Sequence, residues 1–444
     1  MFKSLNTKEN AKITLNITNI FLFEIVFLVT LMTGYVDYYF YYINGYVVFF
    51  LMYLALFILF GKLFYAFNLG DSTTTDLFLS CSLTSVFSCV FIYFVLCLIA
   101  LRIIPLKPVI IMVLIQIVLS AILLYLEDHF IRSTYPPIKV VAIYGEEHYG
   151  LIGKLNNIKD LSMQVIKSID LKDVNYKKLD SILEGADGIV TLDVHHNNKK
   201  KLFKACYDKH LLVYDVPSIT DMLLASSDIL HIVDTPILKI NKFGPSQVER
   251  IIKRLIDIVG SLLLIVLTSP IMLLTALAIF VQDRGDIFYK QTRLTKNKHE
   301  FKIIKFRSMI MNAEKKTGAI LAKENDSRIT PVGRFIRATR IDELPQLINI
   351  LLGDMSFVGP RPERIEIYDE ITKTMPEFDY RLCVKAGLTG YAQIYGKYNT
   401  PLRDKLLLDL YYIEKYSLVE DIKLLILTLK VIFKPESTEG VKDE

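Results

Sequence analysis

Apolar residues are concentrated in four long runs near the start of the chain, and short polar stretches separate these runs. The runs cover about residues 13–35, 43–67, 77–101 and 108–126, and a bilayer crossing takes about 20 apolar residues. Only six of the 52 Lys and Arg residues lie before residue 132. The pattern predicts a membrane protein whose first domain, residues 1–131, is a four-helix transmembrane bundle, and it excludes a purely soluble enzyme.

Basic residues at the start of the chain predict its orientation. Lys3, Lys8 and Lys12 precede the first run, and Lys and Arg are enriched on the cytoplasmic side of membrane proteins. Four crossings then return the chain to the cytoplasm, where we expect the Lys- and Arg-rich remainder. Glu24, inside the first run, is either a functional intramembrane charge or a residue near the interface or in a helix contact.

The pattern changes after two consecutive prolines at 136 and 137. Short apolar runs at 139–145, 187–194 and 211–216 alternate with charged helical stretches, which is typical of α/β domains with a parallel sheet. The sequence after the first predicted strand lacks the G-x-G-x-x-G motif that lets a backbone approach a pyrophosphate. We predict a degenerate Rossmann-like α/β domain over residues 132–240, without a working dinucleotide site.

A fifth apolar run opens the third predicted domain, residues 241–444. It covers residues 255–281, about 40 Å as an α-helix, so its length permits a crossing. Ser269 and Pro270 lie near its middle, and a proline removes a backbone donor and clashes with the preceding turn, so we expect the helix to break there. We predict a re-entrant membrane helix over residues 250–282 that leaves by the face it entered, with a kinked spanning helix as the alternative.

Two adjacent carboxylates follow in the sequence Asp342-Glu343-Leu344-Pro345. Proline is tolerated in the first turn of a helix, so the pattern predicts a helix with Asp342 as its N-cap. The helix should end at Gly353. A pair of carboxylates at this position can share a divalent cation, and the positive helix end suits a phosphate. The alternative is an acidic cap that only stabilises the helix.

Arginines surround this pair in the sequence. Three of them recur every third residue just before it, at Arg334, Arg337 and Arg340. Arg361 follows it, between Pro360 and Pro362, and these prolines restrict the backbone that carries the guanidinium. Because the arginine fork matches phosphate geometry, the arrangement indicates a phosphate site with a metal.

The stretch from about residue 251 to 433 resembles the bacterial sugar transferase family, the monotopic polyprenyl-phosphate hexose-1-phosphate transferases. The resemblance rests on KRLIDIVGS, the Ser269-Pro270 pair, KFRSM, DELPQLINILLGDMSFVGPRPE and GLTGYAQIYG, in family order. The whole chain resembles long-form members, with four membrane helices and a degenerate nucleotide-binding-like domain before a mainly helical catalytic domain. The resemblance implies transfer of a sugar-1-phosphate from a UDP-sugar to undecaprenyl phosphate with release of UMP, the first membrane step of exopolysaccharide, capsule or O-antigen synthesis.

The resemblance also implies roles for individual residues. Asp342 would be the catalytic nucleophile that forms a phosphosugar-aspartyl intermediate, and Asp342 and Glu343 would hold Mg²⁺. Arg337 would contact phosphate, and Pro360, Arg361 and Pro362 would border the uridine or the diphosphate. Lys397 stands where the family often has arginine, so we expect a phosphate ligand without the bidentate grip.

The expected location is the bacterial inner membrane, with the catalytic domain facing the cytoplasm. The expected partners are the lipid bilayer, the UDP-sugar and undecaprenyl phosphate. The net charge of +5 is small and its basic residues are scattered, so we expect no nucleic acid, and a homodimer is left open. Two other hypotheses are an oxidoreductase acting through the middle domain, which the missing glycine motif disfavours, and a non-catalytic membrane scaffold for glycan assembly.

Overall fold

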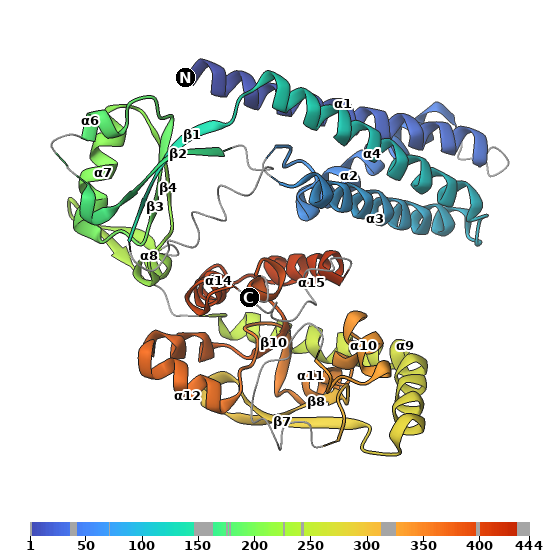
Figure 1. Cartoon of the computed structure of the whole chain (residues 1–444). Coiled ribbons are helices and arrows are strands. Elements are labelled where there is room, and N and C mark those ends of the chain that lie inside the picture. The colour runs from blue at the N-terminus through green and yellow to red at the C-terminus, as the bar shows by residue number, and fades with distance from the viewer. Residues whose placement is uncertain are drawn as a thin grey trace. The chain divides into compact units, whose positions relative to one another are not determined.

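The computed structural model describes residues 2–35, 42–70, 72–145, 163–174, 176, 179–224, 227–240, 244–311, 326–396 and 400–432. They belong to two compact units, Met1–Pro217 and Ser218–Glu444, whose elements are labelled in Figure 1.

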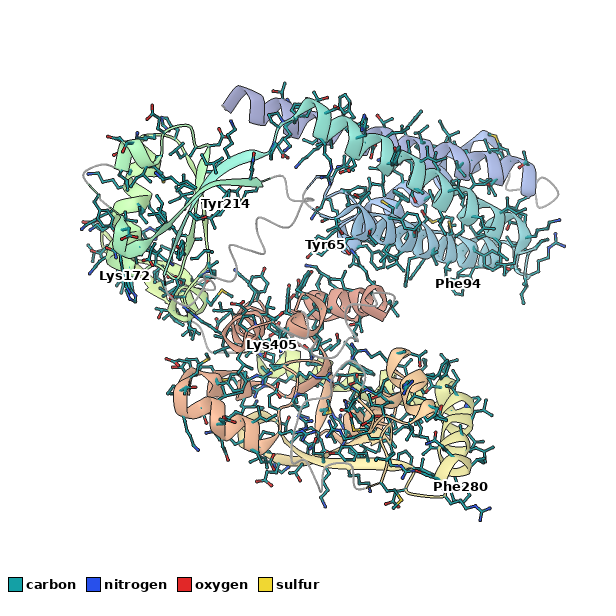
Figure 2. The ribbon with its side chains drawn as sticks, viewed as in Figure 1. Tyr65, Phe94, Lys172, Tyr214, Phe280 and Lys405 are labelled. Atoms are coloured by element: carbon teal, nitrogen blue, oxygen red, sulfur yellow. The ribbon has the colours of Figure 1, made fainter. Side chains whose placement is uncertain are left out.

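Four long apolar helices begin the first unit. They are α1 (Phe2–Gly34), α2 (Tyr42–Phe64), α3 (Thr74–Ala100) and α4 (Lys107–Thr134). Each contains a stretch long and apolar enough to cross a membrane, so the four predicted runs are confirmed as helices. Aromatic rings fill the space between them: Phe27 stacks on Tyr53 with 4.3 Å between ring centroids. Phe94, labelled in Figure 2, lies on an outer face and is 60% exposed, as expected for a surface that contacts lipid.

Glu24 faces the interior of these helices. Glu24 is only 1% exposed, so it lies in a helix contact, one of the alternatives considered for it, and its depth in the membrane stays a prediction. Neither carboxylate oxygen has a hydrogen-bond partner among the described residues.

A four-stranded parallel sheet completes the first unit. Its strands are β1 (Ile138–Tyr144), β2 (Met163–Asp170), β3 (Gly188–Leu192) and β4 (Leu212–Asp215), in the order β2-β1-β3-β4. The helices α6 (Leu179–Ile182) and α7 (His196–Asp208) lie between strands in the sequence. The three predicted strands and their parallel arrangement are confirmed. Strand β2 was missed because it is an edge strand and most of its residues are not buried, so it has no continuous apolar run.

The second unit is mixed helix and sheet around one core. Its strands pair as two antiparallel hairpins, β5 (Asp228–Ile232) with β6 (Thr235–Lys239) and β7 (Phe288–Leu294) with β8 (Glu300–Phe306), and as the parallel pair β9 (Met355–Val358) with β10 (Ala386–Thr389). Its helices are α8 (Ile219–Leu224), α9 (Gln247–Asp283), α10 (Pro331–Ala338), α11 (Gln346–Leu352), α12 (Ile365–Thr374), α13 (Tyr391–Ile394), α14 (Leu402–Glu414) and α15 (Leu418–Ile432). Ile350, Met355 and Leu406 are fully buried in the core.

Helix α9 continues through Pro270, so the predicted interruption of the helix at Ser269 and Pro270 is wrong, whereas the predicted re-entrant turn of the chain there stays a prediction. Pro270 has no N–H to donate to the Val266 carbonyl one turn earlier. The Ser269 hydroxyl donates to that carbonyl instead, at 2.8 Å, so the carbonyl stays satisfied. The helix nevertheless changes direction along its length, between its yellow-green first part and its yellow second part (Figure 1).

Both ends of α9 are held by the second unit. Arg254 donates to the carbonyls of Ile350 and Leu351 at 2.6 and 2.7 Å, and Asp283 pairs with Arg307. The middle of the helix instead exposes large apolar side chains over more than half of their surface, namely Leu263, Val266, Leu267, Leu273 and Leu274. Phe280, nearer its end and labelled in Figure 2, is 48% exposed. Polar anchors therefore flank a segment that packs one face on the second unit, through Leu264 and Ile279, and leaves a row of apolar side chains exposed on the other.

Candidate active site

Asp342 and Glu343 lie in a tight turn, η6 (Ile341–Glu343), between α10 and α11. Arg340 starts the turn in the left-handed conformation, with φ 57°, and Pro345 is the N-cap of α11. Neither cap position has a side-chain capping hydrogen bond, so the prediction that Asp342 is the N-cap is wrong. The turn places the pair before the helix proper, which leaves both carboxylates available for other partners. The predicted helix end at Gly353 is confirmed by its left-handed φ of 99°.

Asn349 connects α11 to strand β8. Its Oδ1 accepts from the amide of Ile304 at 3.0 Å, and its Nδ2 donates to the carbonyl of Lys302 at 2.9 Å. The side-chain amide thus makes the pair of hydrogen bonds to the β8 backbone that a neighbouring strand would make. This contact fixes β8 against the segment that carries the acidic pair.

Glu343 is surrounded by cationic side chains. Its Oε1 accepts from Lys305 Nζ at 2.8 Å and from Arg361 Nη2 at 3.0 Å. Its Oε2 lies 3.9 Å from Arg340 Nη1. Burial alone would raise the pKa of Glu343, but Lys305, Arg361 and Arg340 hold this pKa well below its usual range. Glu343 is therefore a charged carboxylate that keeps its basic neighbours in place.

Asp342 differs from its neighbour in its contacts. The residue is 9% exposed, and its Oδ1 is buried with no hydrogen-bond partner among the described residues. Burial and the charge of Glu343 raise the pKa of Asp342 to about 6, against the opposing effect of Lys305 and Arg337. A buried carboxylate with a shifted pKa and a vacant acceptor is typical of a functional group rather than a structural one.

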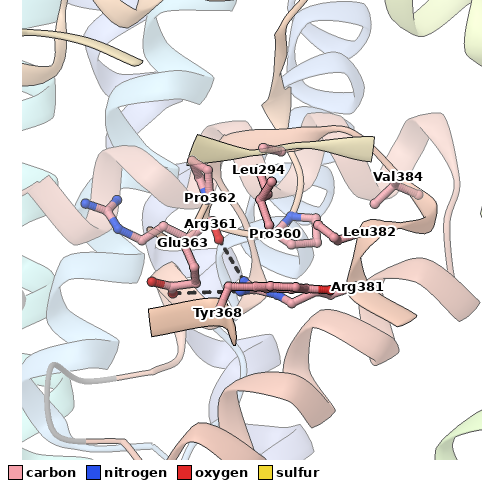
Figure 3. A pocket seen from close by; sticks show the side chains of 10 residues that line it. Leu294, Pro360, Arg361, Pro362, Glu363, Tyr368, Arg381, Leu382 and Val384 are labelled. Carbon is pink, nitrogen blue, oxygen red and sulfur yellow. Dashed lines mark hydrogen bonds and ion pairs between the residues drawn. The ribbon is translucent and has the colours of Figure 1, made fainter. Parts of the chain in front are cut away.

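Arg361 reaches this site from the loop that follows β9. The loop passes so close to β10 that a Cβ on Gly387 would lie 2.1 Å from the Gly359 amide nitrogen, so only glycine fits there. Pro360, Arg361 and Pro362 also line a small pocket together with Glu363 and Arg381, shown in Figure 3. The side chain of Arg361 is thus brought to Glu343 by a closely packed backbone.

The structure brings together Asp342, Glu343 and Arg361, with Arg337 near enough to lower the pKa of Asp342. Arg334 is exposed on α10, and Lys397 lies outside the described residues. Lys305 begins the KFRSM motif, but no role was predicted for it. A second signal was the alternation along β8, where Phe301 and Ile303 are buried and Lys305 is the next residue of the same face.

The acidic pair fits a divalent cation only in part. No group of three or more His, Cys, Asp or Glu side chains that could hold a metal occurs in the described part of the chain. Mg²⁺ is commonly bound by one or two carboxylates, with waters and substrate phosphates completing its shell. The vacant Oδ1 of Asp342 meets that requirement, with Glu343 beside it.

Comparison with known proteins identifies the family of the segment that contains this site. Residues 248–435 match the family described as bacterial sugar transferase. The chain is 39% identical over 182 residues to a UDP-glucose:undecaprenyl-phosphate glucose-1-phosphate transferase of Caulobacter vibrioides, covering 40% of this chain and 68% of that relative. The chain therefore belongs to the bacterial sugar transferase family, a family of enzymes.

Two further relatives match a longer segment. A UDP-N-acetylgalactosamine-undecaprenyl-phosphate N-acetylgalactosaminephosphotransferase of Aeromonas hydrophila is 36% identical over 236 residues, 52% of this chain and 55% of the relative. A UDP-glucose:undecaprenyl-phosphate glucose-1-phosphate transferase of Escherichia coli K12 is 35% identical over 235 residues, 52% and 50% of the two chains. The chain thus matches about half the length of these two relatives.

Proposed function

We propose that this protein transfers a sugar-1-phosphate from a UDP-sugar to undecaprenyl phosphate and releases UMP. The names of its relatives support this reaction class. The observation that carries the proposal is the buried, vacant Oδ1 of Asp342 beside several cationic side chains. An acidic pair that served only as a helix cap, as a non-catalytic scaffold would have, would be bonded to the helix amides.

In the proposed first step, Asp342 Oδ1 attacks the β-phosphorus of the UDP-sugar. A phosphorus–oxygen bond to the carboxylate forms, the bond from the β-phosphorus to the bridging oxygen breaks, and UMP leaves with that electron pair. In the second step an oxygen of undecaprenyl phosphate attacks the phosphosugar-aspartyl group. The carboxylate of Asp342 leaves and is regenerated, and the product is the sugar joined to the lipid through a diphosphate.

The basic side chains have the role of offsetting phosphate charge. Lys305 and Arg361 are held at Glu343, and Arg337 acts on Asp342 through its charge. Fixed positive charges that meet the transferred phosphoryl group lower the barrier without reorganising during the reaction. Mg²⁺ at Asp342 and Glu343 would add Lewis-acid polarisation of the phosphate oxygens.

A lipid acceptor requires that this site lie at the bilayer surface. We propose that α9 is a re-entrant helix, because both of its ends are bonded to the catalytic unit while its middle exposes apolar side chains. The helices α1 to α4 would anchor the chain in the inner membrane with the catalytic unit in the cytoplasm. The lipid-linked product would begin a surface glycan such as an exopolysaccharide, capsule or O-antigen.

UMP release tests the proposal. The full-length protein in lipid nanodiscs is supplied with undecaprenyl phosphate, Mg²⁺ and each member of a panel of UDP-sugars. We expect one or more UDP-sugars to give lipid-dependent UMP, D342N to abolish release, and D369N, at an exposed aspartate of α12, to match the wild type. Undiminished turnover by D342N would exclude the covalent mechanism, and no release from any UDP-sugar would favour the scaffold.

A further inference from the structure

The loop that carries Arg361 is held through its backbone carbonyls. Pro360 and Pro362 have no N–H, so the loop has few amides with which to bond its neighbours. Its carbonyls make the hydrogen bonds instead. The carbonyl of Pro360 accepts from the Gly387 amide at 2.9 Å. The carbonyl of Arg361 accepts from Arg381 Nη2 at 2.8 Å, and that of Pro362 accepts from Arg293 Nη1 at 3.1 Å. Three consecutive carbonyls are thus fixed by three different elements of the fold.

Arg381 is itself held by a buried acid. Its Nε and Nη2 lie 3.0 and 2.7 Å from Asp409 Oδ2, and the two residues are 4% and 1% exposed. Figure 3 shows the guanidinium of Arg381 reaching both the carbonyl of Arg361 and the carboxylate of Glu363. Asp409 on α14 therefore sets the position of Arg381, and Arg381 sets the position of the loop.

A role in stability alone does not explain this arrangement. Two charges lose their hydration when they are buried, and a buried ion pair is often no more stabilising than apolar residues of the same volume. Here Nη2 of the buried Arg381 guanidinium also donates to the backbone carbonyl of Arg361, and the side chain of Arg361 binds Glu343. The contact gives the loop one defined position relative to the acidic pair, which is what placing a guanidinium against a phosphate requires.

We propose that Arg381, held by Asp409, and Arg293 are positioning residues that fix the loop so that the Arg361 guanidinium meets Glu343 and the transferred phosphate. The part of this inference that concerns phosphate rests on the proposed function. Neither residue needs to touch the substrate. Their effect on turnover passes through the backbone of Arg361.

The test is a double-mutant cycle between the positioning residue and Arg361. R381K keeps the charge but loses the fork that reaches both Asp409 and the Arg361 carbonyl. We expect R381K and R361K each to lower kcat by about tenfold or more, with a smaller effect on KM for the UDP-sugar, and the double variant to be no slower than R361K within about twofold. Multiplied losses in the double variant would overturn the inference.

R254K is the matched control for this cycle. Arg254 also donates to backbone carbonyls in the same unit, but at the end of α11. In the double variant, the fold-losses in kcat caused by R254K and by R361K should therefore multiply. If R254K and R381K show the same interaction with R361K in kcat, the substitutions destabilise the whole unit, and the proposal is wrong.

Hydrogen exchange gives a second readout that does not need activity. We expect R381K to raise amide exchange at Gly387, whose amide donates to the Pro360 carbonyl, by about tenfold or more while the α11 amides keep their wild-type rates. If R381K does not fold, R293K offers the same measurement with the Arg381–Asp409 pair intact. Unchanged exchange at Gly387 overturns the positioning role even if UMP is released, whereas a wild type that releases no UMP overturns only the proposed function.

Discussion

Lys305 Nζ donates to Glu343 Oε1 at 2.8 Å, which joins the open end of the β7–β8 hairpin of the second unit to the turn that carries Asp342. Both side chains are largely buried, at 20% and 12% exposed. The contact keeps a carboxylate ionised in a site where burial alone would favour its protonation. The two carboxylates of the acidic pair therefore have different surroundings: Oε1 of Glu343 accepts from two cationic side chains, whereas Oδ1 of Asp342 has no partner among the described residues.

Replacing Lys305 by methionine should weaken both stability and turnover. The variant leaves Glu343 with Arg361 as its close partner, and loss of one hydrogen-bond partner of a buried group costs about 1–3 kcal/mol. The pKa of Glu343 should rise because the lysine charge that lowers it is gone. Denaturant unfolding and UMP release measure the two effects. K302M, at an exposed lysine of the same strand, should change neither, and equal effects of both variants would contradict the assigned role of Lys305.

D342N should stabilise the protein at alkaline pH even though it abolishes activity. The pKa of Asp342 is about 6 in the folded state and 3.8 as its reference value, so the folded state binds more protons and the wild type loses stability as pH rises between about 4 and 6. The neutral asparagine avoids this loss. We expect D342N to be more stable at pH 8 by up to about 3 kcal/mol and equal to the wild type near pH 4.

Thermal unfolding in EDTA at the two pH values checks this prediction, because a bound cation would itself lower the pKa of Asp342. D369N should show no pH-dependent difference from the wild type. A D342N protein that is less stable than the wild type at both pH values would indicate that the carboxylate is part of the structural framework.

The topology of α9 can be tested by labelling on its two sides. In a cysteine-free background, Q247C and D286C place single thiols at the first residue of α9 and after its end, at exposed positions. A re-entrant helix makes both thiols react with a membrane-impermeant maleimide from the cytoplasmic side only. Labelling of D286C from the opposite side would show that the helix spans the bilayer.

The features predicted correctly from the sequence are those set by local patterns. The long apolar helices, the strands β1, β3 and β4 and the helix end at Gly353 follow from periodicity and from the φ preference of glycine. Strand β4 is exposed, whereas β1 and β3 are largely buried. The acidic pair and Arg361 were found because unusual residue types stand close together in the sequence. Their mutual contact was not derivable from spacing, because Arg361 meets Glu343 only after β9 has packed against β10.

The errors have specific physical causes. The helix continues through Pro270 while the Ser269 hydroxyl donates to the Val266 carbonyl in place of the N–H that proline lacks. The general rule that proline breaks helices does not take such a side-chain donor into account. The N-cap prediction failed because Arg340 adopts a left-handed conformation and inserts a tight turn before α11. No role was predicted for Lys305 because a lysine on the inward face of a strand has no local partner, and its acid lies 38 positions further along the chain.

G387A should separate backbone packing from side-chain chemistry at the site. The added Cβ would lie 2.1 Å from the nitrogen and 2.5 Å from the oxygen of Gly359, so β9 and β10 must move apart. Overpacking of this kind costs about 1–3 kcal/mol, and displacement of the following loop should lower kcat by about tenfold or more because Arg361 loses its position. G185A is the control: its φ of 76° makes alanine strained, but no atom lies within 4 Å of the new Cβ. We expect G185A to lose stability without losing UMP release, and a G387A protein with wild-type turnover would show that the loop tolerates movement.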